Sequence, residues 1–225
     1  MGSEPMTQNI HTIIRKIFDD YDEKNGALQK IDYTDRASKI IDTWTQGMNA
    51  HRLTTELICE LHRIVCDDVY IPINDSQGGI SGFSKAGEYR TTHSSAPSAL
   101  HKGSQTLFLH PQDIATKMEQ LATIMNGVLA TNPPKGLMVE NIVAFTVEFL
   151  TVHPFANQNG RIAQILMELL AYRAELEPFY ISYVVKKNKS LITKCVEEVG
   201  ITQSILPFML TIEALRDEAK GDFTK

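Results

Sequence analysis

Hydrophobic residues recur at spacings of three and four along most of the chain, and this spacing predicts amphipathic helices. In the first third, it runs through "NIHTIIRKIFDDY", "YTDRASKIIDTWTQGM" and "TTELICELHRIVCDDV". It returns in "PQDIATKMEQLATIMNGVL" and "KGLMVENIVAFTVEFLTV", continues from Ile162 to Leu170, and ends with "NKSLITKCVEEVG" and "SILPFMLTIEALRDEAK". We therefore expect consecutive helices from one end of the chain to the other.

One long segment lacks this pattern. Residues 72–110 are rich in Gly, Ser and Pro, and only "TLFL" within them resembles a strand. A long loop inside a compact domain is uncommon and is often functional. We expect this segment to form a lid or flap over a site.

The helical spacing and the long loop together predict one all-α domain with a small β element in the loop, and the composition indicates a globular protein. The 225 residues are 43% hydrophobic, which is enough to fill a core. The formal net charge of -5 comes from charges of both signs, without the basic run that binds nucleic acid. The composition therefore argues against nucleic acid as a partner, and it leaves a homodimer open.

Cysteines and apolar runs bear on the compartment. Cys59, Cys66 and Cys195 are odd in number and lack metal-ligand spacing, which indicates buried thiols and a reducing environment. The first residues have no apolar signal core, and no apolar run reaches the roughly 18 residues of a membrane span. We expect a soluble cytoplasmic protein without a membrane partner. An effector exported without a cleaved signal, acting in a host cytosol, would look the same.

The stretch "HPFANQNGR" separates two strongly helical segments. Pro154 disfavours helix at His153, so the first helix should end there. The second should begin near Asn159 to Arg161, where free N–H groups, the helix dipole and Gly160 would together form an anion site. Arg161 could bind a phosphate, and His153 could act as a general base. This combination is typical of phosphoryl or nucleotidyl transfer.

Each feature also has an ordinary reading. A His-Pro at a helix end is usually a helix stop, and an arginine in a first turn is usually a solvated charge. Phe155 would anchor the loop in the core under either reading. His62, His93, His101 and His110 lack ligand spacing and are interpreted as structural or exposed.

The order of residues in "HPFANQNGRIAQ" resembles the signature of the Fic (Fic/Doc) family of protein-modifying transferases. The chain matches it at His153, Pro154, Phe155, Asn159, Gly160 and Arg161. "GEYRTT" is similar to a Gly-x-Tyr/Phe-Arg segment ahead of the family's flap, and "TLFLHPQDIATKMEQL" is similar to the flap and the helix after it. The resemblance covers roughly residues 40 to 215. It implies an all-α Fic fold, a helical bundle with a short β-hairpin flap, with a helical extension at 1–40, the Fic domain at 41–215 and a tail at 216–225.

The resemblance also implies a chemistry. Many family members transfer AMP from ATP to a Ser, Thr or Tyr hydroxyl of a target protein, with Mg²⁺ or Mn²⁺ on the phosphates. His153 would be the general base, and Asn159, Gly160 and Arg161 would hold the phosphates together with positions 158 and 164. The target would dock on the flap around Thr106 to His110.

Three motif positions depart from the family pattern. Asn157 replaces the metal-binding Asp or Glu, and a neutral oxygen binds Mg²⁺ less strongly. Gln158 replaces a glycine at the phosphate site. Gln164 replaces the second arginine, which contacts the terminal phosphate in relatives. The departures leave two hypotheses open: an active transferase of AMP, UMP, phosphocholine or another phosphate-containing group, or a catalytically weak Fic-fold binding module.

The resemblance further suggests that an inhibitory segment has been lost. In relatives, a glutamate in Ser/Thr-x-x-x-Glu-Gly/Asn pairs with the second arginine. The equivalent "TQGMNAH" retains Thr45 but has Asn49 in place of the glutamate, so both members of the pair would be neutral. A second match, Thr193 to Glu197, is followed by Glu198 and is interpreted as an ordinary helix face.

Overall fold

The computed structural model describes residues 4–24, 32–49, 52–67, 70–74, 80–187, 189–202 and 204–223. Its helices are α1 (Glu4–Lys24), α2 (Thr34–Asn49), α3 (Thr55–Val65), α4 (Ile114–Thr131), α5 (Lys135–Val152), α6 (Asn159–Arg173), α7 (Ile181–Lys187), α8 (Lys189–Thr202) and α9 (Leu206–Phe223), with a 3₁₀ turn at Pro111–Asp113 before α4. The all-α fold expected from the periodicity is confirmed.

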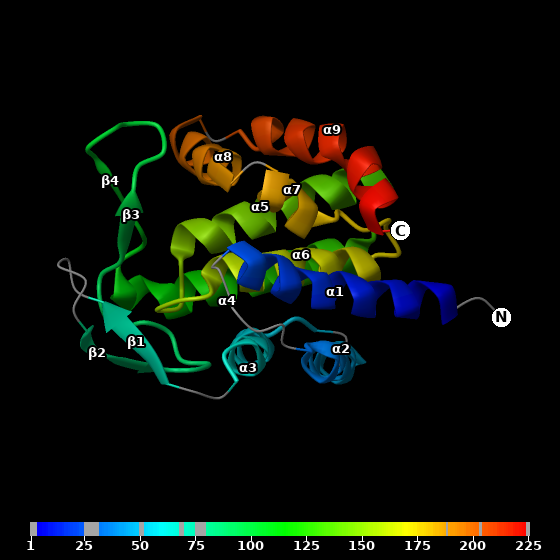
Figure 1. The fold of residues 1–225 in the computed structure, drawn as a ribbon, viewed down its shortest axis with the longest axis horizontal. Coiled ribbons are helices and arrows are strands. Elements are labelled where there is room, and N and C mark those ends of the chain that lie inside the picture. The colour runs from blue at the N-terminus through cyan, green and yellow to red at the C-terminus, as the bar shows by residue number, and fades with distance from the viewer. Residues whose placement is uncertain are drawn as a thin grey trace.

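Two adjacent helices, α5 and α6, occupy the middle of the bundle (Figure 1). α5 was expected to bury one face, yet Phe145 and Val147 are as buried as Ile142 and Phe149. A helix that is hydrophobic all round is buried on every side. Accordingly, α4, α6, α8 and α9 all contact α5.

The first helix belongs to the same core. α1 packs along α6, and its residues Ile10, Ile14, Ile17 and Phe18 join the main hydrophobic cluster. The boundaries expected at 40/41 and 215/216 each fall inside a helix, α2 and α9 respectively. Residues 4–24 are therefore an integral layer of the described bundle.

The long loop contains more β structure than the sequence pattern predicts. β1 (Tyr70–Asn74) pairs antiparallel with β2 (Ile80–Lys85), and β3 (Ser95–Pro97) pairs antiparallel with β4 (Gln105–Leu107). The predicted strand "TLFL" overlaps β4. The other three strands were missed because each carries a residue that weakens the strand pattern: Pro72, Gly82 and Pro97.

The short helix α7 was also missed. Its sequence, "ISYVVKK", is rich in β-branched residues and too short for helical periodicity to emerge. Tertiary packing decides its conformation, since Ile181, Tyr183 and Val184 are all buried.

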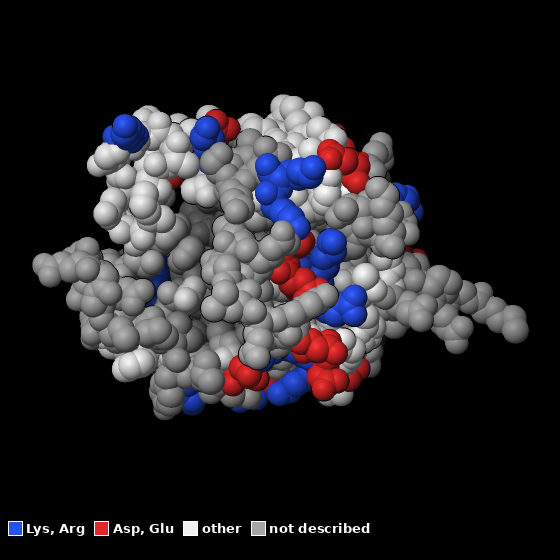
Figure 2. All heavy atoms as spheres, in the orientation of Figure 1, with Lys and Arg blue, Asp and Glu red and all other residues white. Residues whose placement is uncertain are grey.

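Charges of both signs are interspersed on the face shown in Figure 2, in keeping with the absence of a basic run in the sequence. Among the described helices, none is both long enough and apolar enough to cross a membrane.

Candidate functional site

The loop between α5 and α6 has the ends that the sequence predicts. α5 ends at Val152, and His153 follows in a left-handed conformation with φ 50°. α6 begins at Asn159, directly after Gln158, which is left-handed as well with φ 63°. Two left-handed side-chain residues in one short loop are costly, and such strain concentrates at functional sites.

The Asn159 side chain closes this loop on itself. Its Oδ1 accepts a hydrogen bond from the backbone N–H of Phe155 (2.9 Å), and its Nδ2 donates to the carbonyl of Phe155 (2.7 Å). Asn159 is 1% exposed. Its side-chain amide therefore shapes the loop that carries the site, and the phosphate contact expected of Asn159 stays a prediction.

Phe155 connects the loop to α3. It is fully buried and stacks on His62 with ring centroids 3.8 Å apart. The His62 ring accepts from the Gly87 N–H at Nδ1 (2.9 Å), which leaves Nε2 to donate to the carbonyl of Asn157 (3.2 Å). Burial lowers the pKa of His62 to about 4, so the ring is neutral near pH 7 and keeps both bonds.

His153 lies against the flap, which we define as residues 95–110. Its ring stacks on Phe108 with centroids 3.8 Å apart and planes 9° from parallel. Burial lowers the pKa of His153 to about 4, and the charge of Arg90 acts in the same direction. Nδ1 lies 3.4 Å from the carbonyl of Leu150, which can only accept a hydrogen bond. The neutral ring therefore carries its proton on Nδ1, which donates to this carbonyl. Nε2 is then unprotonated and can accept a proton.

His153 and Phe108 line a pocket of about 430 Å³. Its walls come from α1, the flap, α5, the α5–α6 loop, α6, α7, α8 and α9, and the pocket includes every motif position expected at the site: His153, Asn157, Gln158, Asn159, Gly160, Arg161 and Gln164. Much of the remaining wall is apolar, formed by residues such as Ile17, Phe108, Leu150, Val196 and Phe208. A volume of this size is typical of small-molecule sites.

Among the described residues, the cations that line the pocket are Arg161 and Lys186. Arg161 is 6% exposed, and its guanidinium carbon lies 4.9 Å from the ring centroid of Phe18 on α1. Lys186 Nζ lies 3.4 Å from Asp20 Oδ1. Gln164, which stands where the family motif has its second arginine, adds only a neutral amide. Lys186 on α7 supplies a positive charge to the same pocket.

The pocket offers poor ligands for a protein-held metal. The Oδ1 of Asn157 is neutral and accepts a hydrogen bond from the Gln158 N–H at 2.7 Å. Among the described residues, no three His, Cys, Asp or Glu side chains cluster as a metal site would require. Mg²⁺ is normally held by carboxylates together with substrate phosphates, so the residues at this position do not fit a resident metal.

The tip of the flap is attached to α8 through Glu197. This carboxylate accepts hydrogen bonds from the N–H groups of Ala99 (2.9 Å) and Leu100 (3.0 Å) and from the hydroxyls of Ser98 (3.0 Å) and Thr106 (2.7 Å). Burial alone would raise the pKa of Glu197, but these donors hold it below its usual value. The glutamate of the second inhibitory match is therefore bonded to the flap.

The first inhibitory match can be located only in part. Thr45 is an exposed residue of α2, and the side chain of Asn49 lies outside the described residues. Among the described residues, α2 contributes none to the pocket, whereas α1 contributes Ile17 and Asp20.

Sequence reasoning missed several residues that shape the site. Asp20 and Lys186 lie on helices away from the motif in sequence, and no local pattern marks them. Glu197 belongs to the second inhibitory match, whose sequence indicates an ordinary helix face and not an attachment for the flap. Phe108 belongs to the segment expected to form the flap, but its stacking on His153 depends on how the flap packs. Arg90 belongs to "GEYR", the segment recognised by resemblance.

A sequence model described as the Fic/DOC family matches residues 52–171, more than half of the chain. The chain belongs to this family. No curated protein matches its sequence.

Three solved structures share the Fic fold. A Fic domain containing signaling protein from Bacteroides thetaiotaomicron VPI-5482 aligns with a TM-score of 0.62 at 19% identity, over 84% of this chain and 68% of that one. A Fic family protein from Desulfovibrio desulfuricans G20 gives 0.59 at 13%, over 96% and 66%. Fic-1 (aa134 - 508) from C. elegans gives 0.56 at 17%, over 100% and 64%. The Fic chain thus spans about two thirds of each of these structures.

Proposed function

We propose that this Fic protein is a nucleotidyltransferase that moves AMP from ATP to a Ser, Thr or Tyr hydroxyl of a target protein. The observation that carries the proposal is the position of His153. His153 follows the end of α5, and its neutral ring lines the same pocket as Gly160 and Arg161, which lie in the first turn of α6. A proton acceptor beside a helix N-terminus is what transfer of a phosphate-containing group requires.

In the proposed reaction, the target hydroxyl oxygen bonds to the α-phosphorus of ATP. The bond from that phosphorus to the oxygen leading to the β-phosphorus breaks, and pyrophosphate leaves. The hydroxyl proton passes to Nε2 of His153. Arg161 and the N–H groups at the start of α6 stabilise the charge on the phosphoryl oxygens.

The target would reach His153 along the flap. In the described part of the chain β4 pairs only with β3, in a two-stranded sheet, so an extended segment can add to its other edge. Leu107 on β4 is 79% exposed and offers such a segment an apolar contact. The flap also carries Phe108, which stacks on His153, so the docked hydroxyl would be delivered beside the base.

A second candidate is a Fic-fold protein that moves another phosphate-containing group, such as UMP or phosphocholine, or that binds a partner with little catalysis. Gln158 and Gln164 favour it. The Oε1 of Gln158 is buried without a hydrogen-bond partner among the described residues, next to the backbone where a glycine would leave room for phosphate. Gln164 gives the α6 face no charge for a terminal phosphate.

Intact-mass analysis tests the function and separates the candidates. The purified protein is incubated with ATP, UTP or CDP-choline and Mg²⁺ or Mn²⁺, with and without a lysate of denatured acceptor proteins, and the mass increment identifies the transferred group. We expect AMP to be added. His153→Ala should lower the rate by about 10²-fold or more without loss of folding, as expected for removal of a general base.

The matched control is His11→Ala, on α1, which does not line the pocket and should transfer at the wild-type rate. Transfer of UMP or phosphocholine would favour the second candidate. Equal rates in wild type and folded His153→Ala would show that His153 is not the base.

A further inference from the structure

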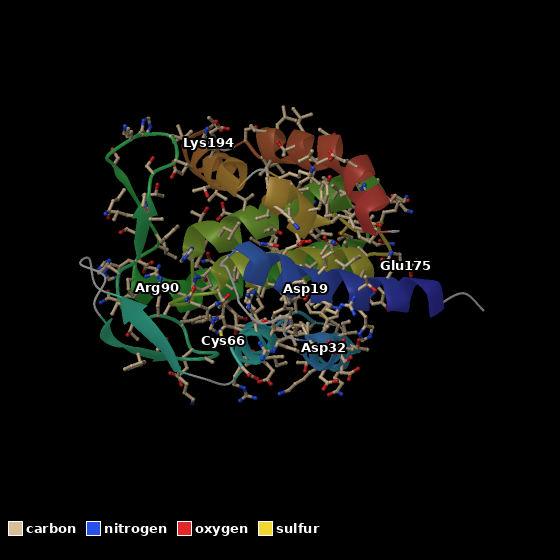
Figure 3. All side chains as sticks on the ribbon, in the orientation of Figure 1. Asp19, Asp32, Cys66, Arg90, Glu175 and Lys194 are labelled. Carbon is tan, nitrogen blue, oxygen red and sulfur yellow. The ribbon has the colours of Figure 1, made fainter. Side chains whose placement is uncertain are left out.

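Arg90 lies where the two β-hairpins join the helical bundle (Figure 3). It is 3% exposed, although guanidinium groups are almost never fully buried without partners. Burial lowers the pKa of Arg90. A charge held in such a place needs strong hydrogen bonds, and their acceptors indicate what the side chain holds together.

The guanidinium donates to four backbone carbonyls from two parts of the fold. Two acceptors belong to the flap and the segment leading into it: Nη1 donates to Thr92 (2.8 Å) and Nη2 to Leu109 (2.6 Å). Two belong to the end of α5: Nε donates to His153 (2.7 Å) and Nη2 to Val152 (3.2 Å). None of these acceptors is a carboxylate, so these hydrogen bonds of the guanidinium hold the backbone of the two segments in place.

The backbone of Arg90 adds a fifth bond. Its N–H donates to the carbonyl of Pro154 at 2.9 Å, just beyond His153. Residues 152, 153 and 154 are therefore all bound by Arg90, at the point where the chain leaves α5 in a left-handed conformation. These bonds fix the direction in which the His153 side chain leaves the backbone.

Arg90 binds the backbone of His153, and the flap contacts the side chain of the same residue. Leu109, bound by Arg90, follows Phe108, whose ring stacks on the His153 ring. A displacement of the flap thus acts on His153 twice, through the stacked ring and through the shared guanidinium. The planar fork of arginine can bridge several carbonyls at once, which a lysine ammonium on a flexible stem cannot reproduce.

We propose that Arg90 is a positioning residue that couples the flap to His153, so that the placement of the flap sets the orientation of the base. The coupling means that a target segment docked on β4 would also align His153. Its catalytic consequence rests on the proposed function, whereas the mechanical coupling of flap and helix end does not.

Amide hydrogen exchange tests the coupling without any activity assay. In Arg90→Lys, which keeps the charge but loses the fork, we expect peptides covering residues 105–109 and 150–155 to exchange faster together, by about tenfold or more. The matched control is Arg216→Lys. Arg216 is a partly buried arginine that, like Arg90, donates to backbone carbonyls, those of Pro178 (3.2 Å) and Glu177 (2.9 Å), but it lies away from the flap. The control should leave both peptides unchanged; acceleration of only one peptide, or of neither, in Arg90→Lys overturns the coupling.

Kinetics then separate positioning from mere stabilisation. In Arg90→Lys, kcat for transfer should fall by about tenfold or more while KM for the nucleotide changes by less than about threefold. An equal fall of kcat in Arg216→Lys, or an unchanged kcat in folded Arg90→Lys, overturns the positioning role. Absence of transfer in the wild type would instead count against the proposed function, and the exchange result would still decide the coupling.

Should Arg90→Lys fail to fold, the wild type alone gives the answer. The N–H of Phe108 is bonded to Ser94 and that of His153 to Phe149, so each reports on one side of the clamp. Under increasing urea, coupled segments open as one unit and their exchange rates rise in parallel. Separate opening free energies for these two amides overturn the proposal.

Discussion

At the scale of single residues, Gln158 occupies a conformation that its side chain disfavours. A left-handed φ of 63° costs a residue with a Cβ on the order of 1 kcal/mol relative to glycine, and the buried Oε1 adds to that cost. The chain keeps this residue at the start of α6, where the N–H groups could otherwise meet an anion. The Gln158 side chain therefore stands beside those N–H groups and lines the pocket.

The substitution Gln158→Gly tests what this side chain does to the pocket. It should raise the free energy of unfolding by about 1 kcal/mol and should tighten ATP binding, because an unobstructed backbone can approach phosphate closely. Urea unfolding and calorimetric titration of ATP measure the two effects. The matched control is Glu175→Gly, an exposed left-handed residue with φ 53° after α6. It should stabilise to a similar extent and leave ATP affinity unchanged, whereas unchanged affinity in Gln158→Gly would show that the side chain does not restrict the site.

At the scale of elements, the flap is held at both of its ends. Arg90 binds its base through backbone carbonyls, and Glu197 binds its tip through two backbone N–H groups and two hydroxyls. A hairpin of three-residue strands is too short to be stable alone. Its position over the pocket therefore depends on these two side chains and on the stacking of Phe108.

We predict that Glu197→Gln loosens the tip of the flap. The neutral amide loses the charge-assisted bonds. Both oxygens of the carboxylate accept hydrogen bonds from the flap, whereas the NH₂ group of the glutamine is a donor and would face the donors of the flap. Amide exchange of residues 98–106 should become about tenfold faster. Glu198→Gln, the next residue on α8, is the control and should change nothing in this segment. If residues 98–106 exchange as in wild type, Glu197 does not hold the flap.

At the scale of the whole molecule, α1 is part of both the core and the site. Phe18 is fully buried, it contacts Arg161 through its ring, and Ile17 and Asp20 from the same helix line the pocket. If α1 were an independent extension, its detachment would leave the pocket intact. In this structure, detachment of α1 would remove Phe18 from Arg161 and Ile17 and Asp20 from the pocket wall.

Phe18→Ala should therefore lower the free energy of unfolding of the entire bundle by about 3–5 kcal/mol, in a single cooperative transition. Urea unfolding followed by circular dichroism measures it. Phe83→Ala provides the comparison, since Phe83 is 63% exposed and its loss should matter by no more than about 0.5 kcal/mol. A main transition unmoved by Phe18→Ala would mean that α1 folds separately.

The helices and the two ends of the α5–α6 loop could be predicted from the sequence. Helical periodicity is a property of neighbouring residues, so eight of the nine helices were predicted within the described chain, and only α7 was missed. The end of α5 at His153 and the start of α6 at Asn159 follow from Pro154 and from a polar loop, which again act locally. The order of residues from His153 to Arg161 was also sufficient to indicate the family.

The surroundings of the α5–α6 loop could not be predicted from the sequence, because they depend on how distant segments pack. The strands β1, β2 and β3 contain residues that disfavour strands, and pairing across the sheet outweighs them. Asp20 and Lys186 line the pocket from helices outside the α5–α6 loop. Arg90 binds the carbonyl of His153 from 63 residues away, and Glu197 binds the hydroxyl of Thr106 from 91 residues away. Their roles depend on which helices pack together, and that packing is set by burial of apolar surface, which has no fixed spacing along the chain.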